Sequence, residues 1–192
     1  MRCSCEKGGE EMSKKLSLRG NFLLADNAML TNHPIFEYEA NDLTRGWVVE
    51  AAYIWPRTTR ASAGTDNGQY QMCASLATDT ARILDFEFIS DATDNRQIGW
   101  CQAGYQSRNS AIADFIANSG NSPNPAAFVI DPEHVVANGL WLNFTTVKDG
   151  SSSPTVSPDR TWNYMVILRP KKLDPKETIL HLIKNFAQDV DN

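Results

Sequence analysis

The sequence has few of the features that mark membrane, secreted or metal-binding proteins. Its 192 residues contain no apolar run near the roughly 18–20 residues of a membrane-spanning helix, so we expect no membrane span. Its four cysteines are too few for a disulfide framework and favour a reducing compartment. Cys3 and Cys5 have no second Cys or His pair at zinc-site spacing. We therefore predict no metal site and no cofactor.

Positive charge is also scarce. The net charge is −5 and the pI is about 5.2, which argues against a dedicated nucleic-acid-binding module because such modules need clustered Lys and Arg. The exception is a short basic stretch, for which we predict at most a weak contact with nucleic acid. It consists of Lys14, Lys15 and Arg19.

Motifs for catalysis are missing as well. The chain has no G-x-S-x-G motif and no glycine-rich phosphate loop. Asp85 and Glu87 would lie about 7 Å apart on one strand face, a separation compatible with hydrolysis of a glycosidic bond. Cys101 could also pair with His134. A solvated acidic face and a buried free thiol explain the same residues, so we predict no catalytic residue and no enzyme.

Alternating apolar residues predict a series of short strands. The pattern becomes regular at Arg45, and the first strand, over residues 45–56, carries Trp47, Val49, Ala51, Tyr53 and Trp55 on one face. A short helix is predicted over 110–118. Together these elements predict a mainly β fold, either a β-sandwich or a β-barrel. The remaining strands are predicted over residues 69–77, 84–89, 97–106, 126–130, 135–147 and 162–168, where Pro170 ends the last one.

The same pattern divides the chain into three parts. Residues 1–44 are predicted to form an N-terminal arm, residues 45–174 the β-sandwich, and residues 175–192 a C-terminal helix. Residues 7–10 can be encoded by a bacterial ribosome-binding sequence, so the native protein is predicted to start either at Met1 or at Met12.

The C-terminal helix has the clearest local signals. Asp174 is a predicted N-cap, Pro175 takes the first helical position, and Glu177 completes a capping box. The apolar stripe of this helix either packs on the chain's own sheet or docks on a neighbouring subunit, and the sequence leaves both open. The predicted assembly interface consists of Ile179, Leu182, Ile183 and Phe186.

Five tryptophans all fall on predicted strands. Packing in the core and at interfaces explains them, because each indole buries a large apolar area. Stacking on sugar rings is the other explanation, with Trp55 and Trp141 as the stacking residues. A carbohydrate-binding module, lectin-like or receptor-binding, is therefore the alternative function.

Three segments resemble the last strands of jelly-roll virion proteins from small tailless bacterial viruses. They are residues 131–136, 139–144 and 163–168. The resemblance extends as an order of elements over residues 45–190, and it implies an antiparallel β-sandwich of jelly-roll type. It also implies a non-enzymatic structural subunit of a virus particle, a phage capsid or other virion protein. It implies self-assembly with copies of itself and with other virion proteins through sheet faces, arm and helix. It also implies synthesis in the bacterial cytoplasm and location in the virion.

Overall fold

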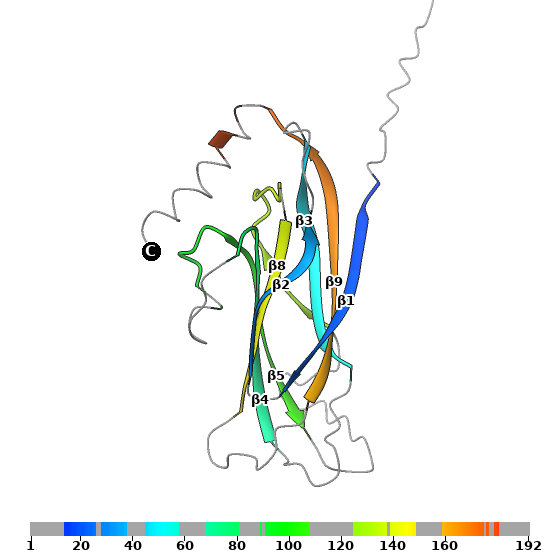
Figure 1. Cartoon of the computed structure of the whole chain (residues 1–192), viewed down its shortest axis with the longest axis vertical. Helices are drawn as coiled ribbons and strands as arrows, with labels where there is room; N and C mark the ends of the chain where they lie inside the picture. Colours follow the sequence, from blue (N-terminus) through cyan, green and yellow to red (C-terminus); the bar gives the residue numbers. More distant parts are fainter. Residues whose placement is uncertain are drawn as a thin grey trace, which may run out of the picture.

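The computed structural model describes residues 14–25, 28–37, 45–57, 68–80, 89, 91–107, 125–137, 139–148, 159–174, 176, 179 and 180. Within these residues the chain forms strands that run along one long axis (Figure 1). They are β1 (Leu16–Ala25), β2 (Met29–Glu37), β3 (Arg45–Pro56), β4 (Gly68–Ala77), β5 (Gln97–Ser107), β6 (Ala126–Ala127), β7 (Val129–Ile130), β8 (Gly139–Lys148) and β9 (Asp159–Lys172).

The strands form two antiparallel sheets that face each other. Their orders are β1-β9-β3-β6 and β2-β8-β4-β5-β7. The pairing is nested, because β1 pairs with β9, β2 with β8, β3 with β6, and β4 with β5. β6 and β7 pair with different sheets, so this short stretch crosses the sandwich at Phe128. Nested pairing across two facing sheets is the jelly-roll arrangement, and the predicted antiparallel β-sandwich is confirmed.

Apolar side chains fill the space between the sheets. Along β9, every second residue from Arg160 to Leu168 is buried, as a strand with one face on a core requires. The Trp162 ring lies 4.5 Å from the Phe144 ring of β8, centroid to centroid, and both side chains are fully buried. The other large side chains buried completely in the main core include Ile54, Leu76, Ile98, Leu140 and Leu142.

A bulge in β3 changes the face on which its aromatic residues lie. Val49 pairs with Leu168, but Ala51 rather than Glu50 pairs with Ile167, so one extra residue is inserted. Trp47 therefore packs against the core, whereas Tyr53 and Trp55 lie on the outer face. The predicted single face running from Trp47 to Trp55 is wrong, because strict period-two alternation cannot anticipate an inserted residue.

Two core strands lie inside the segment expected to be an arm. β1 covers the outer edge of one sheet and β2 the outer edge of the other. The alternating Leu16, Leu18, Phe22 and Leu24 of β1 pack against the core. The part of the expected arm over residues 16–37 is thus integral to the sandwich.

Other boundaries also differ from the predicted ones. β9 continues through Pro170 to Lys172. Trp47, the partner of Pro170, exchanges its backbone hydrogen bonds with Val136 instead, so Pro170 needs no N–H on that side. Val136 forms an isolated bridge, and β8 begins only at Gly139.

Several predictions lie outside the described residues. These include the alternative start at Met12, the helix over 110–118, and the residues Asp85, Glu87, Leu182, Ile183 and Phe186. Of the strand predicted over 84–89, only Ile89 is described, and it is buried against Met29 and Cys73. No helix in the part of the chain that the structure describes has the length and apolar character needed to cross a membrane.

His33 gives the sandwich a pH-dependent stability. Its ring lies 5.5 Å from the Phe22 ring and 5.8 Å from the Tyr164 ring, and this burial lowers its pKa from the ordinary value of 6.5. The unfolded chain therefore binds the proton more readily than the folded chain. The stability from the neutral ring is complete above about pH 6.5 and is lost as the pH falls through the lower pKa of the folded state.

We expect wild-type protein to lose more free energy of unfolding than the His33→Gln variant between pH 7.5 and pH 5.5. Urea denaturation at several pH values measures this difference. Parallel pH profiles for the two proteins would show that His33 does not titrate as described.

Candidate functional site

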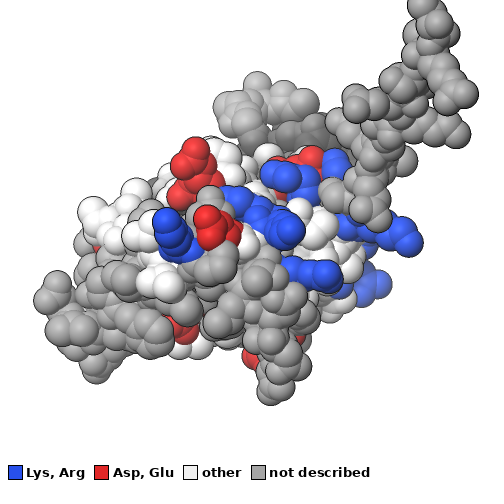
Figure 2. Space-filling view, turned by 90° about the horizontal axis from the view of Figure 1, so that it is seen from above, with Lys and Arg blue, Asp and Glu red and all other residues white. Residues whose placement is uncertain are grey.

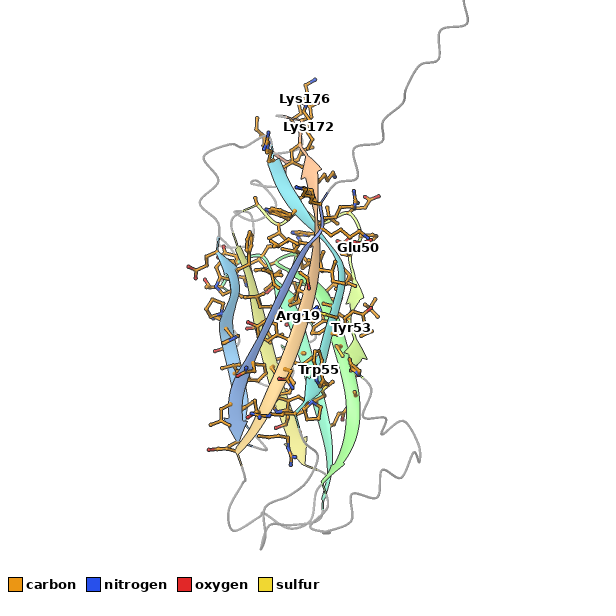
Figure 3. All side chains as sticks on the ribbon, turned by 90° about the vertical axis from the view of Figure 1, so that its right-hand side faces the viewer. Arg19, Glu50, Tyr53, Trp55, Lys172 and Lys176 are labelled. Carbon is orange, nitrogen blue, oxygen red and sulfur yellow. The ribbon has the colours of Figure 1, made fainter. Side chains whose placement is uncertain are left out.

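The exposed surface of β1, β9 and β3 combines aromatic, amide and basic side chains. Its strands lie side by side in Figure 3, where Arg19, Tyr53 and Trp55 are labelled. Burial alternates along β9, and the residues that point away from the core are only partly buried. We call this surface the outer β9 face and define it by Arg19, Asn21, Tyr53, Trp55, Asn163, Met165 and Ile167.

Strand register arranges these residues in rows across the sheet. Arg19 pairs with Met165, which pairs with Tyr53 on its other side. In the next row, Asn163 lies between Asn21 and Trp55. Directly paired side chains lie roughly 5 Å apart, so the Trp55 indole has amide groups within reach along its row.

Basic residues gather where β1 and β3 begin and β9 ends. Arg45 pairs with Lys172, and Leu16, which follows Lys15, pairs with Leu168, which precedes Arg169. Seen from above, Lys and Arg side chains group together at this end of the sandwich, with fewer acidic side chains beside them (Figure 2). We call this the basic end and define it by Lys14, Lys15, Arg45, Arg169, Lys171, Lys172 and Lys176.

Acidic groups neutralise only part of the basic end. The Lys15 amine contacts a Glu50 carboxylate oxygen at 2.7 Å, with both side chains largely exposed. The Asp174 carboxylate accepts a hydrogen bond from the Lys176 backbone at 3.3 Å, the contact expected of an N-cap residue. Among the described residues, Arg169, Lys171 and Lys172 have no carboxylate partner.

Only part of this surface could be found in the sequence. The stretch Lys14, Lys15 and Arg19 was visible as a local cluster. Arg45, Arg169, Lys171 and Lys172 were missed, because they join that cluster only through the β1-β9 and β3-β9 pairings. The alternating basic residues at the end of the last strand are the sequence signal that could have revealed this part of the surface.

The two tryptophans proposed for sugar stacking do not meet. Trp55 lies on the outer β9 face, whereas Trp141 lies on β8 in the opposite sheet. The Trp141 indole covers the position where a side chain of Gly139 would stand, and its register neighbours are Pro34 and Ala77. Each tryptophan would have to serve a separate site.

A second group of polar residues joins the ends of β4, β5 and the loop before β8. His134 is buried, with Nε2 3.5 Å from the Thr78 hydroxyl and Nδ1 3.9 Å from an Asp131 carboxylate oxygen. The order Asp-His-Thr matches that of a hydrolytic triad, but the Thr78 hydroxyl donates to the Arg96 carbonyl at 3.3 Å. The contacts of Thr78 tie two loops together.

The Cys101 thiol is a poor nucleophile in this fold. Burial is the main cause that raises its pKa to about 11, with a further contribution from Cys73. The thiol therefore stays protonated at neutral pH. Cys101 forms no disulfide, as the sequence predicts. No group of three or more His, Cys, Asp and Glu among the described residues is arranged to hold a metal ion.

Two described residues of the segment predicted to form the C-terminal helix expose apolar side chains. Ile179 is 56% exposed and Leu180 is 60% exposed. Ile179 belongs to the predicted apolar stripe of this helix. Its exposure leaves an apolar surface available next to the end of β9.

Comparisons with known proteins add little to this description. No family model and no curated protein matches the chain. Among solved structures, it is similar to a chain of the cryo-EM structure of mud crab tombus-like virus, with 14% identity and a TM-score of 0.32. The match covers 95% of this chain and 93% of that chain. With identity and TM-score this low, we base the fold class on the strand order of this chain alone.

Proposed function

We propose that this protein is a non-enzymatic structural subunit of a virus particle, which assembles with copies of itself and with other virion proteins. Jelly rolls occur in viral capsid proteins, in lectin domains and in cupins. Because one fold serves several functions, the choice among them depends on where the functional side chains lie.

The filled interior is the observation that carries this proposal. A cupin-like site needs polar ligands inside the barrel, whereas Trp162, Phe144 and their apolar neighbours occupy the interior here. The groups able to make contacts lie on the outside of the sandwich, as they do in a subunit that works through its surfaces.

The C-terminal helix supplies the proposed contact between copies. Exposed Ile179 and Leu180 lie beside each other directly after the sandwich ends. Burying the exposed part of these two side chains in a neighbouring copy contributes about 2–3 kcal/mol. Repeated at every subunit, this contact would link each copy to its neighbours.

Charge substitutions in this helix test the contact. We expect the double variant Ile179→Asp, Leu180→Asp to remain folded, since both side chains are exposed, but to lose assembly at concentrations where the wild type is oligomeric. Light scattering after size-exclusion chromatography measures the mass. Val129→Asp is the matched control, because Val129 is 74% exposed on β7. An unchanged mass for the helix variant would contradict this role for the helix.

The bacterial origin of the particle is part of the proposal. It is supported by the resemblance of residues 131–136, 139–144 and 163–168 to virion proteins of tailless bacterial viruses, and by the coding potential of residues 7–10. A ribosome-binding sequence directly upstream of the Met12 codon, next to genes for replication or packaging, would support synthesis in a bacterial host. Neighbouring genes of eukaryotic type would contradict it.

A carbohydrate-binding module is the second candidate, and the position of Trp55 favours it. A partly exposed indole beside the amides of Asn163 and Asn21 has the composition of a sugar-binding surface. If the protein has this function, it should be a monomer that binds neutral glycans, and the Trp55→Ala variant should not bind them. A glycan array run with both proteins separates it from assembly.

A further inference from the structure

We infer that the basic end and the outer β9 face together bind single-stranded nucleic acid. The phosphodiester backbone would lie along the basic end, and unpaired bases would stack on Tyr53 and Trp55. The inference goes beyond self-assembly and does not require it, because the surface belongs to β1, β3 and β9 and not to the apolar residues of the C-terminal helix.

Cationic side chains converge at this surface from segments far apart in the sequence. Arg45 comes from the start of β3 and pairs with Lys172 from the end of β9. Arg169 and Lys171 alternate on the outer side of β9, next to the start of β1 with Lys14 and Lys15. Concentrating these charges in a chain of net charge −5 produces a local positive potential that suits a polyanion.

Some of these charges are available for a ligand. Arg169, Lys171 and Lys172 have no carboxylate partner among the described residues. The ion pair of Lys15 with Glu50 at this end is solvent-exposed and so contributes little that a phosphate could not replace.

Aromatic residues continue the same surface away from the basic end. Tyr53 and Trp55 are two residues apart on β3, so their side chains share a face at a spacing of about 6.6 Å. Arg19 lies in the same row as Tyr53 and adds a charge beside the ring. In Figure 3, Lys172 and Lys176 lie at one end of the face and Arg19, Tyr53 and Trp55 follow below them.

The combination of basic and aromatic side chains on this surface favours a single strand over other polyanions. A groove of positive charge with aromatic platforms is the usual surface for single strands, since every unpaired base has a face that can stack. A duplex hides its bases and gains nothing from Tyr53 or Trp55. An anionic membrane offers headgroup charge but no rings to stack.

Fluorescence anisotropy tests the inference directly. The full chain is titrated into a fluorescein-labelled 20-nucleotide oligo(U) between 50 and 200 mM KCl. We expect binding that weakens with salt, with a slope of about 0.7 in log K per log [salt] for each phosphate contacted. Arg169→Gln, Lys171→Gln, which changes two side chains on the outer side of β9, should lower the affinity roughly tenfold and reduce the slope by about 1.4.

Two further variants separate charge from stacking. Lys148→Gln is the matched charge control, because Lys148 is the last residue of β8 in the opposite sheet, and it should leave affinity and slope unchanged. Trp55→Ala should weaken binding roughly tenfold with the salt slope unchanged, and Trp55→Phe should restore most of the affinity.

Three outcomes would overturn the inference. The first is no binding of oligo(U) at 50 mM KCl, and the second is an equal loss in Lys148→Gln and in the Arg169, Lys171 variant. The third is binding of a 20-base-pair duplex or of phosphatidylserine vesicles that equals or exceeds binding of the single strand. Any of these together with normal assembly would reject the nucleic-acid surface and leave the proposed structural function intact.

Discussion

Replacement of Trp162 by alanine should lower the free energy of unfolding by about 4 kcal/mol. Trp162 has 0% of its surface exposed and packs against Phe144, which joins it to Phe22 through a second ring contact of 5.2 Å. Removing the indole leaves a cavity between two sheets that their hydrogen-bonded strands hold apart. The loss of buried apolar surface and the cavity therefore both lower the free energy of unfolding.

Urea denaturation followed by circular dichroism measures this loss. Trp55→Ala is the matched control, because Trp55 lies partly exposed on the outer β9 face, and it should cost no more than about 1 kcal/mol. Equal losses for the two variants would mean that Trp162 is not at the centre of the core.

Replacement of Asp94 by alanine should cost about 3 kcal/mol. The Arg96 guanidinium donates Nε to one Asp94 oxygen at 2.9 Å and a terminal nitrogen to the other at 3.0 Å. Arg96 is only 7% exposed, so loss of the carboxylate leaves a buried cation without its bidentate partner. The same carboxylate also accepts the Arg96 backbone N–H, which holds the turn before β5.

The exposed pair Lys15–Glu50 is the matched control for this ion pair. Its shortest N–O distance is 2.7 Å, shorter than in the buried pair, yet Glu50→Ala should cost less than about 1 kcal/mol because water screens the charges. Thermal and urea denaturation of both variants measure the contrast. A cost for Asp94→Ala as small as that for Glu50→Ala would show that burial does not strengthen the Arg96 interaction.

Strands with uninterrupted alternation could be predicted from the sequence. β4 and β5 begin and end within one residue of their predicted bounds, and the strand predicted over 162–168 is the central part of β9. One face of each of these strands packs on the core. The Asp174 cap was also predictable, since capping depends on neighbouring residues only.

The edge strands were harder to predict because their patterns are interrupted. In β1, Gly20 replaces an inward-facing apolar residue, and the Tyr164 ring occupies the space where its side chain would stand. In β2, Asn32 has a φ of 53° and its N–H donates to the Asn143 side chain at 2.8 Å, where the pairing with β8 is irregular. Both features depend on partners more than 100 positions away.

The basic end could not be predicted for a related reason. Arg45 and Lys172 are neighbours only because β3 and β9 pair in one particular register. Local composition shows the cluster at residues 14–19 but not the residues that complete it. The bulge after Val49 likewise sets Trp47 and Trp55 on opposite faces, which an alternating pattern cannot show.

Cryo-electron microscopy of the purified full chain at increasing concentration tests the central claim most directly. If the protein is a structural subunit, uniform closed particles should form from the wild type, and the Ile179→Asp, Leu180→Asp variant should stay as folded single subunits. A wild-type protein that remains monomeric at every concentration, in low and in high salt, would contradict the account.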